Sequence, residues 1–219
     1  MVPAESLSNL IRKIIDYAGL FPPAKLNISE SLKNYSKIIK SKESWIGSQF
    51  IIPINRLEEI SPLLMKSFSN EYPLILSVIS SNINNEIDCL NNFTSSYSDI
   101  VKVTGHESKI SDVLSLDEYL ANVENLFEKY KYNVNSFYEI SLSNDWISKM
   151  QNALSIISKF NKISDSRIGF KLRCGGIDKS MFPPPEYIAE SITVCCKNSI
   201  PMKFTAGLHH PISHFNKML

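Results

Sequence analysis

Two hydrophobic patterns alternate along the chain. Short runs of β-branched residues, bounded by Pro, Gly or Asn, are typical of buried strands, and longer stretches with apolar residues three and four apart are typical of helices. The runs predict strands at residues 17–21, 48–53, 73–79, 100–104, 136–142, 167–173 and 201–206. The longer stretches predict helices at residues 28–42, 57–69, 83–93, 116–130, 145–160 and 185–198.

Strands that alternate with helices, with no hairpin signal between them, predict an α/β fold with a parallel sheet. A doubly wound open sheet and a closed barrel share this order. We favour a TIM-like (β/α) barrel, because several strands carry polar residues on one alternating face. Residues 1–219 then form a single domain, in which residues 1–15 hold an N-terminal capping helix. No eighth βα unit follows residue 206, so we expect a barrel truncated after its seventh strand.

Composition narrows the classes of partner. A chain of 219 residues is long enough for one sizeable core. Its net charge of +1 gives no general attraction to nucleic acid or to anionic lipid, so we predict neither as a partner. The N-terminus has no signal-peptide layout and no apolar run has the length of a membrane span. The cysteines lack CxxC spacing, which predicts reduced thiols in a cytoplasmic protein.

Charged residues share one face of four predicted strands. Successive strand residues point to opposite faces of a sheet, and in a barrel the apolar face packs on the outer helices. The polar face therefore points inward. The charged residues that we expect inside the barrel for this reason are Lys102, Glu139, Lys171, Arg173 and Lys203.

Such a cluster is costly unless it is used, because buried unpaired charge is strongly destabilising. We expect one lysine of the set to be uncharged, since burial and neighbouring cations both disfavour its charged form. An uncharged lysine is a nucleophile that forms a Schiff base with a carbonyl compound. We assign Lys171 as that nucleophile, Lys203 as the neighbouring cation and Glu139 as the group that transfers or orients a proton. The alternative is that all the cations stay charged and bind a phosphate or carboxylate.

Glycines directly follow two of these strands, at the ends where barrel active sites form. They allow a ligand to approach the backbone closely. The residues that we assign to the binding of a small anionic substrate are Asp16, Lys102, Arg173, Gly175, Gly176, Thr205, Gly207, His209 and His210.

A histidine cluster offers a second chemistry. His209, His210 and His214 lie within six residues, and His210 and His214 have the helical spacing that can place two metal ligands on one side. Glu139 or Asp16 can complete such a site, and His106 can join either site. A polar loop whose histidines cap a helix or bind substrate oxygens explains the same residues. We favour the loop, and therefore predict no metal ligand and no cofactor.

Three segments of the chain resemble an uncharacterised bacterial protein family. They are DYAGLFPPA at residues 16–24, KLRCGG at residues 171–176 and KFTAGLHHP at residues 203–211. The segments are spread over the whole chain. Membership implies no particular chemistry, but members of the family continue beyond the last segment, which agrees with a truncated barrel here.

A fainter similarity is to deoxyribose-phosphate aldolase, a Schiff-base barrel enzyme. Its first strand is similar to residues 15–22, and Glu139 matches its fifth strand in residue type. Lys171 matches the Schiff-base lysine, and Lys203 matches the second lysine that tunes it. The chain departs from the aldolase at Lys102, where the aldolase has an acid for proton transfer. The resemblance implies a class I aldolase-like lyase and leaves the substrate open.

The leading hypothesis is therefore an enzyme of carbonyl chemistry, such as a carbon–carbon lyase. A metal-dependent barrel enzyme that uses His209 and His210 is one alternative. A non-catalytic binding module or inactive fragment is another. The open sheet edge of a truncated barrel needs a partner strand, which allows a homo-oligomer.

Overall fold

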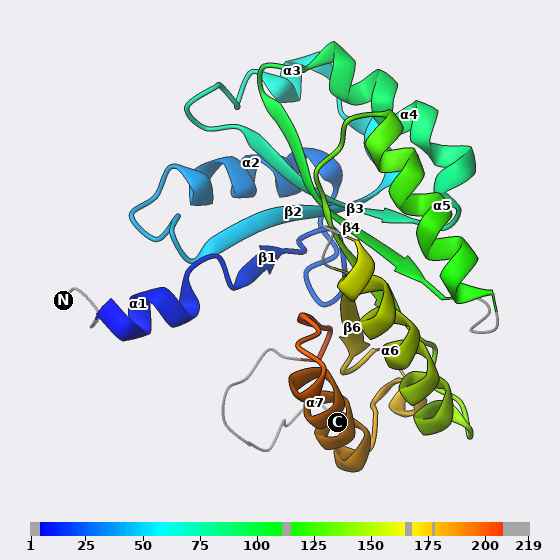
Figure 1. Ribbon diagram of the computed structural model, residues 1–219. Coiled ribbons are helices and arrows are strands. Elements are labelled where there is room, and N and C mark those ends of the chain that lie inside the picture. The colour runs from blue at the N-terminus through cyan, green and yellow to red at the C-terminus, as the bar shows by residue number, and fades with distance from the viewer. Residues whose placement is uncertain (1–4, 111–114, 165–167, 177, 208–219) are drawn as a thin grey trace. The chain divides into compact units, whose positions relative to one another are not determined.

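Strands and helices alternate along the chain in the computed structural model, which describes residues 5–110, 115–164, 168–176 and 178–207. The strands are β1 (Ile15–Tyr17), β2 (Gly47–Pro53), β3 (Leu74–Ser80), β4 (Val101–Lys109), β5 (Asn135–Glu139), β6 (Gly169–Arg173) and β7 (Met202–Thr205) (Figure 1). The α-helices are α1 (Glu5–Ile11), α2 (Ile28–Ile39), α3 (Pro62–Met65), α4 (Ile83–Ser96), α5 (Leu116–Lys129), α6 (Trp146–Ile163) and α7 (Pro185–Lys197). Two short 3-10 helices, η1 (Ile54–Glu59) and η2 (Lys179–Met181), complete the described elements.

The chain divides into two compact units. Unit 1 comprises Met1–Ser108 and Asn122–Asn135, and unit 2 comprises Lys109–Ala121 and Ser136–Leu219. In unit 1, β2 pairs in parallel with β1 and β3, and β3 pairs in parallel with β4. In unit 2, β6 pairs in parallel with β5 and β7. The predicted α/β class with parallel strands is thus confirmed.

A capped helix covers the first strands of unit 1. Asn27 is the N-cap residue of α2, and its side chain accepts a hydrogen bond of 2.9 Å from the backbone N–H of Glu30. Tyr35 then lies on the buried face of the helix and packs edge-on against Phe50 of β2, with 5.5 Å between ring centroids. Its hydroxyl donates to the Ser48 carbonyl oxygen at 3.0 Å, so the buried polar atom of this aromatic anchor is satisfied.

The core of unit 2 forms between the strands and helices α6 and α7. Trp146 at the start of α6 stacks on Tyr187 of α7, with 4.8 Å between centroids, and its Nε1 donates to the Ile140 carbonyl oxygen at 3.2 Å. Phe170 and Leu172 of β6 are buried in the same cluster. Burial of these apolar side chains fixes one face of β6 against the helices, which leaves the opposite face for its charged residues.

Strand β4 is longer than the sequence predicts. The prediction that it ends at Thr104 is wrong, because β4 continues to Lys109 through a register shift in its pairing with β3. Gly105 lies at this irregularity, and a Cβ there would collide with the side chains of Gln49 and Ser77. The glycine therefore allows two neighbouring side chains to approach the backbone, as at a β-bulge, and does not end the strand.

Two other predicted elements are corrected. The helix expected at residues 57–69 is replaced by η1 and the single turn of α3, because Ser61 before Pro62 has the extended backbone that a following proline favours. The first strand is Ile15–Tyr17, ahead of the predicted residues 17–21. No helix among the described residues is long and apolar enough to cross a bilayer.

His106, a candidate site residue, is a core residue of unit 1. Its ring lies edge-on to Phe127, with 5.0 Å between centroids, and its Nε2 is 2.7 Å from the Ser80 hydroxyl. The side chain is fully buried, and this burial lowers the pKa of His106 to about 4. His106 is therefore neutral in the folded protein at pH 7.

Burial of a neutral histidine predicts a loss of stability in mild acid. Between pH 6.5, the ordinary histidine value, and pH 4, the unfolded chain binds a proton that the folded chain does not. The free energy of unfolding should therefore fall by about 3 kcal/mol over this window because of His106 alone. Urea unfolding of the wild type and of a His106→Gln variant, each at pH 7 and pH 4.5, measures the difference. Equal losses in the two proteins would contradict the assignment.

Candidate active site

Three charged residues form a row across the strands of unit 2. The parallel register pairs Glu139 of β5 with Lys171 of β6, and Lys171 with Lys203 of β7. One step further along, Arg173 is paired with Thr205. Residues paired in this way point to the same side of a sheet. The predicted alternation therefore places these five side chains on one face, opposite to the buried Phe170 and Leu172.

The centre of the row is buried. Glu139 is 2% exposed and Lys171 is 8% exposed. Their charged atoms, Lys171 Nζ and Glu139 Oε2, are 3.1 Å apart. Glu139 Oε2 has no hydrogen-bond partner among the described residues, so this contact is an ion pair without hydrogen-bond alignment. A pair of this kind offsets much of the cost of burying each charge, while leaving the carboxylate able to accept a proton.

Two more cations approach the other oxygen of Glu139. Arg173 Nε donates to Oε1 at 3.3 Å, and Lys109 Nζ lies 4.0 Å from the same atom. The side chains of Arg173 and Lys109 are 39% and 63% exposed. The Glu139 carboxylate therefore forms ion pairs with one buried cation and with two cations that reach solvent.

Lys203 contacts an aromatic ring from the same face. Its Nζ lies 5.7 Å from the centroid of the Phe137 ring, within the range of a cation–π interaction. Phe137 is paired with Gly169, and a Cβ at Gly169 would collide with the Phe137 ring. The absence of a side chain at Gly169 thus leaves room for the Phe137 ring, which lies near the Lys203 ammonium group. The predicted role of Lys203 beside Lys171 remains a prediction.

The loops that follow β6 and β7 are packed directly on one another. Cys174 N donates to the Thr205 carbonyl oxygen at 2.7 Å, and a Cβ on Gly175 would lie 2.8 Å from Gly207 Cα. Gly207 has a φ of +70°, in the left-handed region that favours glycine. These two glycines thus permit contact between backbones, whether or not a ligand is bound.

Two hydrogen-bonding groups complete this end of the strands. Arg173 Nη1 donates to the Gly175 carbonyl oxygen at 3.4 Å, which orients the guanidinium along the loop. Thr205 Oγ1 is buried and has no hydrogen-bond partner among the described residues. Gly176 is exposed, and a Cβ there would collide with the Met181 side chain. The substrate-binding roles of these residues stay predictions.

The other predicted residues belong to unit 1 or fall outside the described residues. Asp16 and Lys102 belong to unit 1, where Asp16 Oδ1 accepts a hydrogen bond of 3.1 Å from Gln49 N and Lys102 is exposed. His209 and His210 lie outside the described residues. Within the described part of the chain, no three His, Cys, Asp or Glu side chains gather where a metal ion could bind.

Lys109 is the site residue that the sequence analysis missed. It belongs to the part of β4 beyond Thr104, where the sequence predicts the end of the strand. The alternation of Gly105, Glu107 and Lys109 on one face was the available signal. Ile110 N donates to the Glu139 carbonyl oxygen at 2.8 Å, so a backbone contact holds Lys109 beside the carboxylate that it faces.

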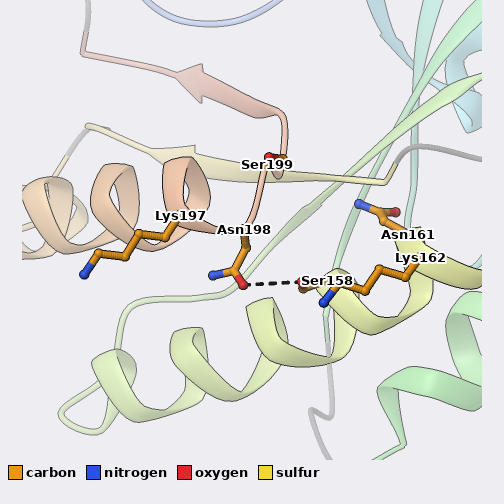
Figure 2. Close-up of a pocket in the computed structure, with 6 residues that line it drawn as sticks. All are labelled: Ser158, Asn161, Lys162, Lys197, Asn198 and Ser199. Carbon is orange, nitrogen blue, oxygen red and sulfur yellow. Dashed lines mark hydrogen bonds between the residues drawn. The ribbon is translucent and has the colours of Figure 1, made fainter.

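A depression of about 340 Å³ lies at the other end of unit 2 (Figure 2). The side chains that line it come from the last turns of α6 and α7 and from the residues that follow α7: Ser158, Asn161, Lys162, Lys197, Asn198 and Ser199. Asn161 bonds both backbone polar groups of Ile168, before β6 begins. Lysines in the last turn of a helix favourably face its carbonyl ends. Structural roles account for these residues, so the candidate active site is the row at Glu139.

Comparison with protein-family models and with curated proteins finds no match for the chain. The case for a function therefore rests on the geometry of the residues themselves.

The buried pair at Glu139 predicts a specific pattern of stability. Glu139→Gln removes a counter-charge from the buried Lys171 and should lower the free energy of unfolding by about 3 kcal/mol. The double variant Glu139→Leu with Lys171→Met removes both charges and should recover most of that loss. Asp145→Asn, which breaks the exposed ion pair with Lys149 in the same unit, is the control and should leave the urea midpoint unchanged. A Glu139→Gln protein as stable as the wild type would disprove the pairing.

Proposed function

We propose that the chain is a lyase of the Schiff-base type, in which the Lys171 amine attacks the carbonyl group of a small anionic substrate. The observation that carries the proposal is a buried lysine paired with a buried glutamate, with 3.1 Å between Lys171 Nζ and Glu139 Oε2. A carboxylate at this distance can take a proton from the ammonium group and return it later.

The first half of the reaction forms the covalent intermediate. Glu139 accepts a proton from Lys171, and the amine adds to the carbonyl carbon to give a carbinolamine. Glu139 then returns the proton to the hydroxyl group, which leaves as water. The product is a protonated imine, so the positive charge of Lys171 is conserved.

The second half breaks the carbon–carbon bond. The imine accepts the electron pair of the bond that breaks and becomes an enamine, while the β-hydroxyl group loses its proton as the first product aldehyde forms. The enamine is then protonated at carbon, and water releases the second product and restores the amine. Glu139 Oε2 lies 3.1 Å from Lys171 Nζ, so we assign the proton transfers to this carboxylate. Lys203 takes the neighbouring position, where its charge disfavours a second charge on Lys171.

The proposed enzyme is a TIM-like barrel of the cytoplasm. Parallel pairing in chain order supports the barrel, and Arg173 and Thr205 end their strands, where barrel active sites form. The faint similarity to class I aldolases supports the same chemistry. The cysteines are free, which agrees with a reducing compartment.

Borohydride trapping tests the reaction. Wild-type protein incubated with short aldehydes and 2-oxo acids that carry a phosphate or carboxylate, then reduced, should gain one ligand mass per chain. Peptide mapping should place the label on Lys171, at least about 10-fold above any exposed lysine at neutral pH, since its amine is activated by Glu139. Lys171→Met should abolish this label.

Lys149→Met is the matched control, because Lys149 is an exposed lysine of the same unit whose ion pair with Asp145 lies on α6. Its substitution should leave the trapping unchanged. Label spread evenly over exposed lysines, or retained by Lys171→Met, would rule out the proposed nucleophile.

A further inference from the structure

One carboxylate of the site faces three cations. Glu139 lies within 4.0 Å of Lys109, Lys171 and Arg173. When all four side chains are ionised, the group carries a net charge of +2, and formation of an imine at Lys171 leaves this charge unchanged. Like charges held together in a partly buried site repel, and a bound anion relieves the repulsion.

The cations differ in how far they reach solvent. Lys171 is buried, whereas Arg173 and Lys109 are 39% and 63% exposed and share a single carboxylate oxygen. Arg173 engages Glu139 through Nε alone, not through the two parallel hydrogen bonds that a guanidinium can offer a carboxylate. The hydrogen bonds described for Arg173 use Nε and Nη1, so Nη2 is the donor that we assign to a ligand.

A buried hydroxyl lies on the strand next to Arg173. Thr205 is the register partner of Arg173 on β7, so the two side chains share a face at the ends of their strands. Thr205 Oγ1 is buried and lacks a hydrogen-bond partner among the described residues. A buried polar atom without a partner is costly, and a ligand oxygen at this position would satisfy it.

We propose that Lys109, Arg173 and Thr205 bind the anionic group of the substrate, and that this group is a dianion such as a phosphate monoester. That the bound anion belongs to the substrate rests on the proposed function. Glu139 divides the site into two parts, with the reacting amine of Lys171 at Oε2 and the anion-binding cations at Oε1. Lys109 is thereby a specificity-determining residue, and its charge is what makes a doubly charged group preferable to a singly charged one.

Binding of inorganic phosphate, measured by isothermal titration calorimetry on the full chain, tests the anion-binding site of Lys109, Arg173 and Thr205 without the covalent chemistry. Lys109→Met and Arg173→Met should each weaken binding by about 10-fold or more, the range expected for loss of one hydrogen bond to a charged group. Thr205→Val should weaken it less, because the hydroxyl is neutral. Lys149→Met, which changes an exposed lysine of α6 paired with Asp145, should bind phosphate as the wild type does. Thermal unfolding confirms that each variant is folded, and Lys109→Gln replaces Lys109→Met where needed.

The charge of the ligand is tested with two anions of similar shape. Sulfate, a dianion, should bind at least about 10-fold more tightly than methanesulfonate, a monoanion, and the ratio should shrink in Lys109→Met. Equal affinities for the two anions, or an unchanged ratio in the variant, would overturn the role of Lys109.

The two proposals fail in different ways. Phosphate binding that depends on Lys109, without borohydride trapping at Lys171, would support the anion-binding site and reject the Schiff-base reaction. Trapping at Lys171 that is unaffected by Lys109→Met, in a protein that does not bind phosphate, would support the Schiff-base reaction and reject the anion-binding site.

Discussion

Burial of the Glu139 carboxylate is the constraint on which the arrangement of unit 2 depends. The strand that carries it is fixed by Tyr138 on its opposite face, which is fully buried in the helix-facing core. Period-two alternation then leaves Glu139 no route to solvent. A carboxylate in that position is tolerated only with positive charge beside it, and β6 supplies that charge at the paired position, Lys171. The apolar core and the ionic row are thus two consequences of one strand register.

Parallel pairing also orders the site along the strand direction. In successive steps the shared face carries Phe137 with Gly169, then Glu139 with Lys171, then Arg173 with Thr205. The first step is apolar, the second is ionic and buried, and the third reaches the packed loops of Gly175 and Gly207. The most buried charged step, Glu139 with Lys171, thus lies between a half-buried aromatic residue, Phe137, and the partly exposed Arg173. Because the strands are parallel, these steps follow the same order on each of them.

The sequence predicts those parts of the site that depend on neighbours along the chain, and misses those that depend on contacts between strands. Alternation on β6 was predictable, because Phe170 and Leu172 form a strong apolar period of two on a strand with both neighbours present. The same alternation predicts that Met202 and Phe204 of β7 share the apolar face of that strand. Met202 does pack on the core, but Phe204 is 38% exposed. Lys109 was missed because the role of Gly105 depends on the side chains of Gln49 and Ser77, which come from other strands. A glycine at a bulge and a glycine at a strand end look alike in sequence. The break at Pro62, by contrast, has a local signal in the proline itself. The prediction of one helix at residues 57–69 followed the apolar spacing instead.

The geometry around Glu139 separates two demands that usually conflict. A nucleophilic lysine is best shielded from water, whereas residues that capture a charged ligand must be reachable from solvent. A single bifunctional carboxylate meets both demands, because its two oxygens face opposite neighbours: the buried Lys171 at Oε2, and the exposed Arg173 and Lys109 at Oε1. An anion bound at the Oε1 side, as we propose, would compete with Glu139 for those two cations, so that the ligand and Lys171 would be linked electrostatically through one side chain. A substrate whose anionic group lies far from its carbonyl group would lose that link.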